Sequence, residues 1–152
     1  MLRLTFHNWY GLRAAVLRLF GARIGRATRV SRSVRIFAPW RLDLGNGVAV
    51  GDGAILYSVG CIRIEHAAVI SQYAHLCAGT HDYRDPAFPV VRGDISVGTG
   101  AWVATDAFVG PGVRIGARAI LGARACAFKD LDADFVYVGN PARRSHLRQG
   151  EV

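Results

Sequence analysis

Residues 97–122 read VGTGAWVATDAFVGPGVRIGARAILG, and every sixth residue of this stretch is Val, Ile or Leu. The same repeat covers most of the chain, with aliphatic residues at fourteen of its fifteen positions. The positions are Ile24, Val30, Ile36, Leu44, Val50, Leu56, Ile64, Ile70, Leu76, Val97, Val103, Val109, Ile115, Leu121 and Ala127. A period of six matches neither an α-helix nor a two-residue strand repeat, but it fits a short strand followed by a corner, three to a coil. The repeat therefore predicts an all-β chain folded as a parallel β-helix of about five coils, roughly 24 Å tall.

Departures from the repeat show where this β-helix is interrupted. Three coils carry two residues more than three hexads, and we interpret the added pairs as corner extensions. The pairs are Leu42-Asp43, Ile62-Arg63 and Ile95-Ser96. One coil also contains an inserted loop of thirteen residues, 82–94. A long loop inside a regular repeat is usually functional, so we expect the chemistry to lie beside it.

The repeat divides the chain into a helical cap at 1–23, the β-helix at 24–138 and a C-terminal tail at 139–152. In the first segment the apolar residues fall on one side of a short helix, opposite Arg13 and Arg18. These apolar residues are Trp9, Leu12, Val16, Leu19 and Phe20. The segment is interpreted as a cap that closes the first coil, with contact to a membrane surface as the alternative. Because arginines interrupt every apolar run, neither a signal peptide nor a membrane span is expected.

Composition limits the classes of partner. The net charge of +8 comes from 18 Arg and one Lys against 11 acidic residues. This charge indicates a solvated surface, or attraction to anionic substrates or an acidic membrane. We expect no nucleic acid partner, because neither a recognition element nor a groove of stacking aromatics is visible. The cysteines Cys61, Cys77 and Cys126 lack metal-ligand spacing and favour a reducing cytoplasm over a disulfide framework.

His81 is the candidate for chemistry, since it ends a hexad immediately before the inserted loop. A histidine held at a rigid corner beside a loop can meet a substrate, although a surface or structural role is the alternative. The spacings between His66, His75 and His81 do not place paired ligands on one element. No metal site is therefore expected.

Several motifs in fixed order resemble those of the left-handed β-helix O-acetyltransferases. The motifs are Gly79-Thr80-His81-Asp82-Tyr83, Gly100-Ala101-Trp102-Val103-Ala104-Thr105, Gly122-Ala123-Arg124-Ala125, Lys129-Asp130 and Val138-Gly139-Asn140-Pro141-Ala142-Arg143. The resemblance covers nearly the whole chain, including the N-terminal segment and Pro39-Trp40. Within the class the chain is most similar to the WcaF-type colanic acid biosynthesis acetyltransferases, close to the galactoside and maltose acetyltransferases. The resemblance implies a left-handed coil, a homotrimer with active sites between subunits, and acetyl-CoA as co-substrate.

The resemblance also implies roles for individual residues. His81 is the general base that takes a proton from an acceptor sugar hydroxyl in exopolysaccharide or lipid-linked oligosaccharide assembly, and Asp82 could orient it. The acetyl-CoA contacts carried over by motif are Trp102, Thr105, Ala123, Lys129 and Arg143. Each has an alternative as an ordinary surface residue. The loop residues that could contact the sugar are Tyr83, Arg84, Asp85 and Arg92.

One departure from the family pattern concerns the acceptor. Galactoside-type members place an Asn one coil before the histidine, where this chain reads Leu56-Tyr57-Ser58-Val59-Gly60. A different acceptor is therefore expected. Two other functions fit the fold: a metal-dependent hydratase of the carbonic anhydrase type, whose His-x-x-x-x-His pair is missing here, and a non-catalytic scaffold.

Overall fold

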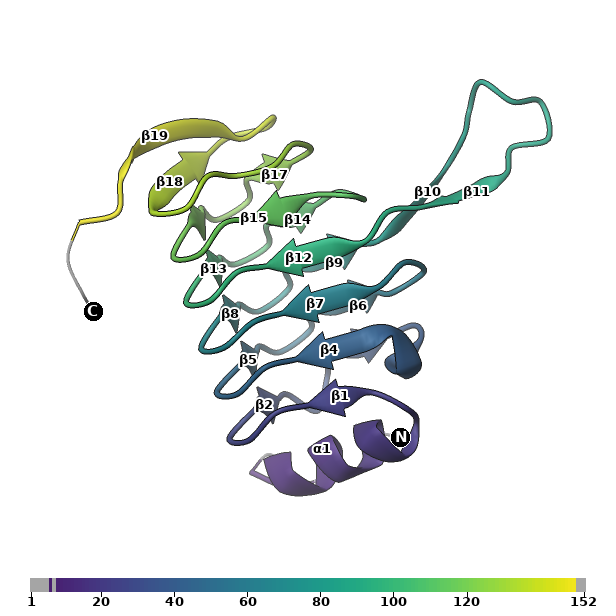
Figure 1. Cartoon of the computed structure of the whole chain (residues 1–152), viewed down its shortest axis with the longest axis vertical. Coiled ribbons are helices and arrows are strands. Elements are labelled where there is room, and N and C mark those ends of the chain that lie inside the picture. Colours follow the sequence, from purple (N-terminus) through teal and green to yellow (C-terminus); the bar gives the residue numbers. More distant parts are fainter. Residues whose placement is uncertain (1–5, 7, 150–152) are drawn as a thin grey trace.

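The computed structural model describes Phe6 and residues 8–149 and shows a triangular prism of stacked coils (Figure 1). Each coil contributes one short strand to each of three parallel sheets, here called faces A, B and C. Face A contains β1 (Arg23–Ile24), β4 (Leu42–Leu44), β7 (Ile62–Ile64), β12 (Ile95–Val97) and β15 (Arg114–Ile115). Face B contains β2 (Arg29–Val30), β5 (Ala49–Val50), β8 (Val69–Ile70), β13 (Trp102–Val103), β16 (Ile120–Leu121) and β18 (Phe135–Val138). Face C contains β3 (Arg35–Ile36), β6 (Ile55–Tyr57), β9 (His75–Cys77), β14 (Phe108–Val109) and β17 (Cys126–Ala127).

The coil is left-handed. In Figure 1 the front strands β4, β7 and β12 point to the left while the chain climbs from the N-terminal helix to β18. A chain that rises in this way and returns behind the front sheet winds in the left-handed sense, the exception to the usual right-handed crossover. Five coils are complete, and β18 with the bridge from Ile115 to Leu131 begins a sixth. The predicted β-helix of about five coils is confirmed.

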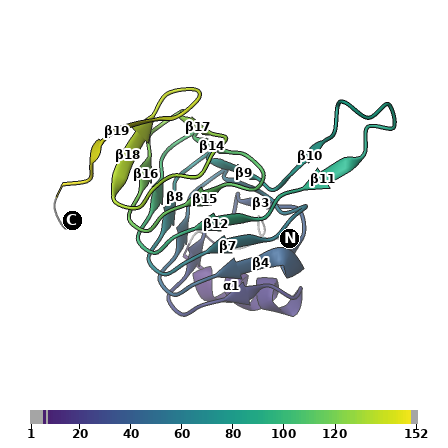
Figure 2. The ribbon, with the colours of Figure 1, turned by 45° about the horizontal axis from the view of Figure 1, so that its top comes forward.

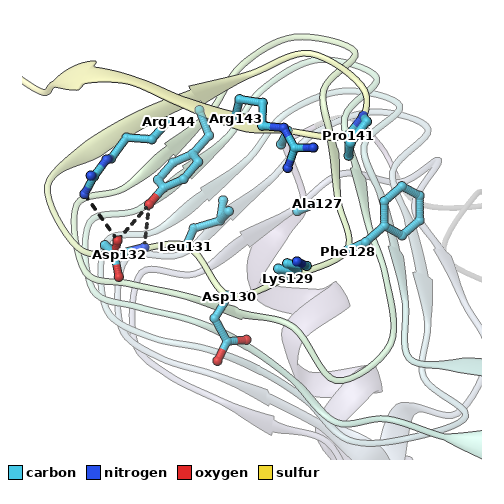
Figure 3. A pocket seen from close by; sticks show the side chains of 11 residues that line it. Ala127, Phe128, Lys129, Asp130, Leu131, Asp132, Pro141, Arg143 and Arg144 are labelled. Atoms are coloured by element: carbon cyan, nitrogen blue, oxygen red, sulfur yellow. Dashed lines mark hydrogen bonds and ion pairs between the residues drawn. The ribbon is translucent and has the colours of Figure 1, made fainter.

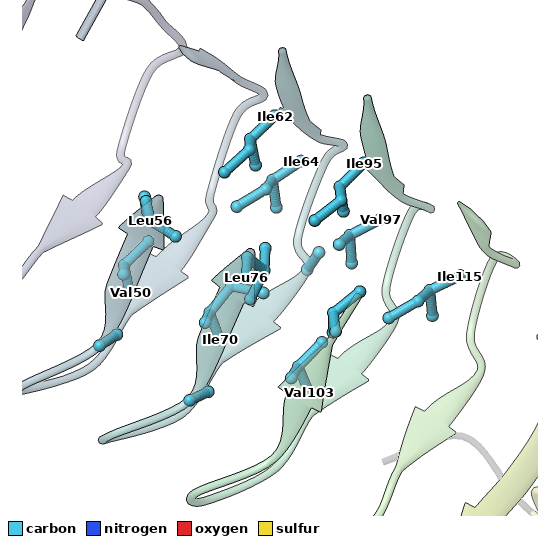
Figure 4. Packing of buried hydrophobic residues seen from close by; sticks show 14 of the residues in the cluster. Val50, Leu56, Ile62, Ile64, Ile70, Leu76, Ile95, Val97, Val103 and Ile115 are labelled. Carbon is cyan, nitrogen blue, oxygen red and sulfur yellow. The ribbon is translucent and has the colours of Figure 1, made fainter. Parts of the chain in front are cut away.

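The core is a set of columns of aliphatic side chains that run along the prism axis (Figure 4). Ile64, Val97 and Ile115 occupy equivalent positions in successive strands of face A, and each is buried. Val50, Ile70 and Val103 form the corresponding column on face B. Branched side chains of similar volume stack in this register without leaving voids, which explains the six-residue repeat.

The three added pairs were expected to extend the corners, but they do not. They lengthen β4, β7 and β12 to three residues each. Leu42, Ile62 and Ile95 pair in register with one another and point into the core, where each is buried. An added pair keeps the two-residue alternation of a strand, so the extra aliphatic residue returns to the inner face. These coils therefore gain an inward residue on face A.

The N-terminal helix α1 (Tyr10–Leu19) lies across the first coil and packs against β1 and β2. The prediction of which side of this helix faces the first coil was wrong. Leu12 and Leu19 are 46% and 83% exposed, whereas Arg13, Ala14 and Leu17 are the buried residues. Arg13 Nε donates a hydrogen bond of 2.6 Å to the Val30 carbonyl oxygen.

The reason for the reversed orientation is the open end of the β-helix. The first coil has carbonyl groups with no coil below them, and a buried carbonyl without a donor is costly. Arg13 supplies donors to Val30, and Arg18 Nη2 donates to the Ile24 carbonyl at 2.8 Å. Both arginines were expected on the solvent side, and of the two Arg18 is exposed while Arg13 is not. The helix therefore covers the coil with guanidinium groups as well as with Ala14 and Leu17.

The remaining elements project from the prism or close its far end. The 3-10 helix η2 (Pro39–Arg41) precedes β4, and the strands β10 (Gly79–His81) and β11 (Val90–Arg92) form an antiparallel hairpin. This hairpin occupies the place of the predicted loop at 82–94 and extends away from the coils (Figure 1). In the C-terminal segment, β19 (Arg143–Leu147) folds back antiparallel to β18, as Figure 2 shows from above. Residues 1–5, 7 and 150–152 lie outside the described residues.

Substitution of an inward residue tests the core columns. We expect Ile70→Ala to lower the free energy of unfolding by about 2–5 kcal/mol, because it leaves a cavity between two tightly stacked coils. Val69, the preceding residue in the same strand, is 38% exposed and provides the matched control. Val69→Ala should cost less than about 1 kcal/mol. Chemical denaturation measures both values, and equal losses for the two variants would contradict the inward register.

Candidate active site

His81 lies at the end of β10, where the chain has left the prism to form the hairpin. The departure depends on Gly79, because a Cβ at this position would lie 2.7 Å from Val59 Cβ. His81 pairs with Val90 across the hairpin and is exposed. The histidine is therefore presented on a projecting strand rather than at the corner that the sequence analysis expected.

The imidazole is fixed by Phe88, in the loop that leads into β11. His81 Nδ1 lies 2.7 Å from the Phe88 carbonyl oxygen, and the two rings stack with centroids 4.4 Å apart and planes 10° apart. A carbonyl oxygen only accepts hydrogen bonds, so this contact assigns the proton of the neutral ring to Nδ1. Nε2 is then left with a free lone pair. His81 is thus held in the tautomer that a general base requires.

Phe88 is the residue of this site that sequence reasoning missed. Its φ of 49° lies in the left-handed region, which is unfavourable for a bulky side chain. Phe88 N donates to the Asp85 carbonyl at 2.8 Å, a bond that closes the turn leading into this conformation. No signal in the sequence shows that the loop returns a carbonyl oxygen to the histidine.

The structure places Asp82 in the turn and not at the imidazole. Asp82 Oδ1 accepts a hydrogen bond of 3.0 Å from Arg84 N, and Asp82 N donates to the Pro89 carbonyl at 3.0 Å. An aspartate that bonds to the backbone two residues on is a common turn device. The Phe88 carbonyl occupies the position at Nδ1 that was considered for Asp82.

The loop residues considered for sugar contacts form the outer part of the hairpin. Tyr83 and Arg84 are exposed, and the Arg84 guanidinium lies 5.6 Å from the centre of the Tyr83 ring. Asp85 Oδ1 accepts a hydrogen bond of 2.8 Å from Ala87 N, so one oxygen of this carboxylate stabilises a second turn. Arg92 lies at the base of the hairpin, paired with Gly79. Only Arg92 among these residues is close to the prism.

Trp102 lies on the outside of face B. Its indole N–H donates to Ser71 Oγ at 2.8 Å, and its strand lies between those of Val69 and Ile120. Thr105 and Ala123 lie at the corners between faces B and C of successive coils. These corners are linked because Arg124 N donates to the Thr105 carbonyl at 2.9 Å. A single subunit therefore carries these three residues on a different part of the prism from His81.

Lys129 and Arg143 meet in a cavity of ≈ 380 Å³ at the C-terminal end of the prism (Figure 3). Lys129 follows β17 at the corner between faces C and A, and Arg143 begins β19. Phe128 and Pro141 form part of the apolar lining. Arg144 pairs with Asp132 at 3.6 Å, but within residues 8–149 neither Lys129 nor Arg143 forms an ion pair. The cavity, which Asp130 also lines, thus offers two cations that form no ion pair in the described structure, and such cations can bind phosphate.

Three groups of candidate residues result from this arrangement. The corner between faces C and A, here called the C/A edge, carries the hairpin with His81 and, two coils further on, Lys129. Arg143 begins β19, which belongs to the sheet of face B, and lines the same cavity as Lys129. Trp102 lies on face B, and Thr105 with Ala123 lies on the edge between faces B and C. The structure thus places His81 and Lys129 at the same corner, two coils apart, and leaves Trp102, Thr105 and Ala123 on other parts of the prism.

The other histidines do not form a metal site in the described part of the chain, where no three His, Cys, Asp or Glu side chains gather closely enough to bind an ion. His66 Nδ1 accepts from Asn46 N at 2.9 Å and so joins two coils. His75 lies on face C against the edge of the Phe108 ring, at a centroid distance of 5.4 Å. Burial lowers the pKa of His75 below its ordinary value, and the positive charge of Arg35 lowers that pKa further.

The chain has sequence relatives among the acetyltransferases. No protein-family model matches the chain. The chain is 47% identical over 133 residues to WcaF of Escherichia coli (strain K12), which is named as a colanic acid biosynthesis acetyltransferase. That match covers 88% of this chain and 73% of WcaF. A chloramphenicol acetyltransferase of Morganella morganii is 26% identical over 114 residues, which cover 71% of this chain and 52% of that enzyme.

Solved structures share the same coil. A hexapeptide-repeat acetyltransferase of Vibrio cholerae O1 biovar eltor, complexed with acetyl-CoA, superposes with a TM-score of 0.89 at 19% identity and covers 98% of this chain and 82% of its own. A galactoside acetyltransferase in complex with CoA gives a TM-score of 0.89 at 17% identity. That match covers 97% of this chain and 76% of the galactoside acetyltransferase chain. The fold and the motif order therefore define a hexapeptide-repeat acetyltransferase. With the identity to WcaF over most of both chains, the chain belongs to the WcaF family of these enzymes.

The pKa of His75 provides a test of the electrostatics of face C. Since the folded state lowers this pKa, the unfolded chain binds the proton more readily at mildly acidic pH. The contribution of His75 to stability is then present above its unfolded pKa of about 6.5 and is lost as the pH falls through the lower folded pKa. We expect NMR titration of the folded protein to show His75 protonating below the ordinary histidine pKa of about 6.5. Protonation of His75 at or above this value would contradict the effect of its burial.

Proposed function

We propose that this protein transfers an acetyl group from acetyl-CoA to a sugar hydroxyl in exopolysaccharide or lipid-linked oligosaccharide assembly. The observation that carries the proposal is the contact of 2.7 Å between His81 Nδ1 and the Phe88 carbonyl oxygen, which leaves Nε2 as a base. Membership of the WcaF family supports acetyl transfer and the polysaccharide context. The acetyl-CoA and CoA complexes of proteins with this fold support the co-substrate.

In the proposed reaction His81 acts on the acceptor directly. Nε2 takes the proton of the hydroxyl as its oxygen forms a bond to the thioester carbonyl carbon. The resulting tetrahedral oxyanion is stabilised by backbone N–H groups at the coil corners. The bond from carbon to sulfur then breaks, and the imidazolium returns its proton to the leaving thiolate. No acetyl-enzyme is needed, because both substrates are held in one cleft.

The CoA-binding part of the proposal rests on charge and position. Lys129 and Arg143 share a cavity without a compensating ion pair, so they can hold the phosphates at the nucleotide end of CoA. Trp102, Thr105 and Ala123 are proposed to line the path of the pantetheine arm. Because these residues lie on another side of the prism from His81, one chain cannot surround the substrate alone. We therefore assign the active site to a cleft between the subunits of a homotrimer.

The N-terminal end supports a cytoplasmic enzyme that contacts the inner face of the membrane. The first 42 residues contain nine Arg and no Asp or Glu, and Trp9 and Leu19 of the α1 region are exposed. Exposed apolar groups beside cations are the features that bind a helix to an anionic membrane surface. Within the described residues no helix is long and apolar enough to cross a bilayer.

The assay that tests the proposal is CoA release from acetyl-CoA in the presence of a panel of nucleotide sugars and oligosaccharides. With the acceptor that this panel selects, we expect His81→Ala to lower kcat by roughly 10²- to 10⁴-fold, because positioned proton transfer is lost. The Kd for CoA should stay unchanged, since His81 is not part of the phosphate-binding cavity. Full activity in a correctly folded His81→Ala protein would rule out His81 as the base.

The contrasting variant is the double substitution Lys129→Ala with Arg143→Ala. This variant removes the two cations of the cavity that form no ion pair in the described structure and leaves the hairpin sequence unchanged. We expect CoA to bind at least about tenfold more weakly in calorimetry, because charge-assisted hydrogen bonds to the phosphates are lost. Unchanged CoA affinity would show that the nucleotide of CoA does not bind in the cavity of Figure 3.

A further inference from the structure

A second groove opens on the C/A edge, near the N-terminal end of the prism. It has a volume of ≈ 250 Å³, is formed around Trp40 of η2 and is lined by residues of the first three coils. The indole is 63% exposed, although large aromatic side chains are usually covered. An exposed tryptophan in a groove needs an explanation that the core does not provide.

The backbone around Trp40 is built to hold the indole in place. Pro39 occupies the first turn of η2 and fixes its local backbone. Gly21 passes beneath, where a Cβ would lie 2.9 Å from Trp40 Cβ, and its φ of 87° is in the left-handed region. Glycine therefore allows both the turn and the close approach. The position of Trp40 is determined by the backbone, while much of its side chain remains available to a ligand.

The charge around the groove is unbalanced. Arg23, Arg41 and Arg63 line it, and Asp43 is the one acidic residue in its lining. Asp43 Oδ2 lies 3.9 Å from Arg23 Nη1 and 3.5 Å from Arg63 Nε. In the described structure the Arg41 side chain has no ion pair. One carboxylate thus faces three guanidinium groups, which leaves capacity for an anionic ligand.

The groove lies on the same edge as His81. Ala38 N donates to Ser58 Oγ at 2.9 Å, and Gly60 N donates to the Ala78 carbonyl at 2.8 Å, so these bonds join the successive corners below the hairpin. In Figures 1 and 2 the short helical turn before β4 is on the side of the prism from which the hairpin projects. Two coil rises, about 10 Å, separate the two levels. The ring pair Phe37 and Tyr57, with centroids 5.1 Å apart, lies between them.

The direction of the co-substrate determines what can reach this groove. If the CoA phosphates lie at Lys129 and Arg143, the thioester approaches His81 from the C-terminal side. The acceptor must then approach from the N-terminal side, where Trp40 lies. A pyranose ring has an apolar C–H face that can stack on an indole, and guanidinium groups form paired hydrogen bonds with carboxylate or phosphate.

We propose that the Trp40 groove is an acceptor subsite that binds an anionic sugar unit, carrying a carboxylate or a phosphate, next to the unit that is acetylated. The proposal deepens the proposed function and rests on it for the direction of the acceptor. Trp40 stacks on the ring of this unit, and Arg41 with Arg63 binds its anionic group. The enzyme then selects acidic chains over neutral chains through residues remote from the base.

Calorimetry with three probes tests the subsite. The probes are a galacturonic acid trisaccharide, glucose 1-phosphate and the neutral maltotriose. We expect at least one anionic probe to bind about tenfold more tightly than maltotriose, the effect of one charge-assisted hydrogen bond pair. Preference for the trisaccharide assigns a carboxylate, and preference for the sugar phosphate assigns a phosphate. Equal binding of maltotriose, or no binding of either anionic probe, overturns the proposal.

Two variants and a control locate the binding. Trp40→Ala and, separately, Arg41→Ala should each weaken binding of the anionic probe about tenfold. Arg32→Ala removes an exposed arginine from another edge and should leave this binding unchanged. If only Arg32→Ala weakens binding, or if Arg41→Ala leaves it unchanged, the subsite is refuted. Circular dichroism checks that each variant is folded. If Trp40→Ala does not fold, Arg41→Ala alone tests the subsite.

Measurement of CoA binding in the same calorimeter separates this proposal from the proposed function. Loss of probe binding in Trp40→Ala with no binding of CoA to the wild type would support the subsite and contradict acetyl transfer. The subsite alone would be contradicted by normal CoA binding and a large effect of His81→Ala on kcat, if the affinity for the anionic probe is also unchanged in Trp40→Ala and Arg41→Ala.

Discussion

The structure depends on the register between successive coils, which is set by aliphatic side chains stacked along the inside of the prism. Ile64, Val97 and Ile115 occupy one column, and a shift of one residue in any strand would turn such a side chain outward. Backbone hydrogen bonds between coils enforce the same register, as at Glu65 N to the Val97 carbonyl, 2.8 Å. The edges of the prism are therefore rigid. A side chain at one corner has a fixed height and direction relative to the next.

This rigidity explains how a small protein with a single columnar core can hold an exposed histidine in a fixed orientation. The chain leaves the prism at Gly79 and returns through β11, and the hairpin brings the Phe88 carbonyl to His81 Nδ1. A backbone acceptor fixes the tautomer without adding a negative charge beside the ring. The unfavourable φ of Phe88 is the local cost of this contact. The coil below and the coil above supply the two directions from which substrates can approach.

Much of the fold could be predicted from the sequence because the repeat reports the inside of the prism directly. The columns, the position of the insertion and the placement of His81 beside it follow from spacing alone. The added pairs were misinterpreted as corners, since spacing does not distinguish a longer corner from a longer strand. Burial of Ile62 and Ile95 in the structure decides between them.

The contacts that depend on unpaired backbone groups could not be predicted. An apolar pattern places Arg13 in solvent, but the open carbonyls of the first coil draw its guanidinium inward. Asp82 precedes the loop in sequence, and only the folded hairpin shows that its carboxylate bonds to Arg84 N and that Phe88 contacts His81. Lys129 and Arg143 are fourteen positions apart, and the return of β19 along β18 brings them together. In each case the return of the chain, which no local pattern encodes, sets the contact.

The central claim is that His81 serves a thioester held along the C/A edge between subunits. A crystal structure of the protein with CoA tests this claim most directly. The account predicts the CoA sulfur within about 4 Å of His81 Nε2, a distance at which a proton can pass to the leaving thiolate. The nucleotide phosphates should contact Lys129 and Arg143, and a second subunit should complete the cleft. A CoA molecule bound with its sulfur remote from every His81 in the assembly would contradict the account.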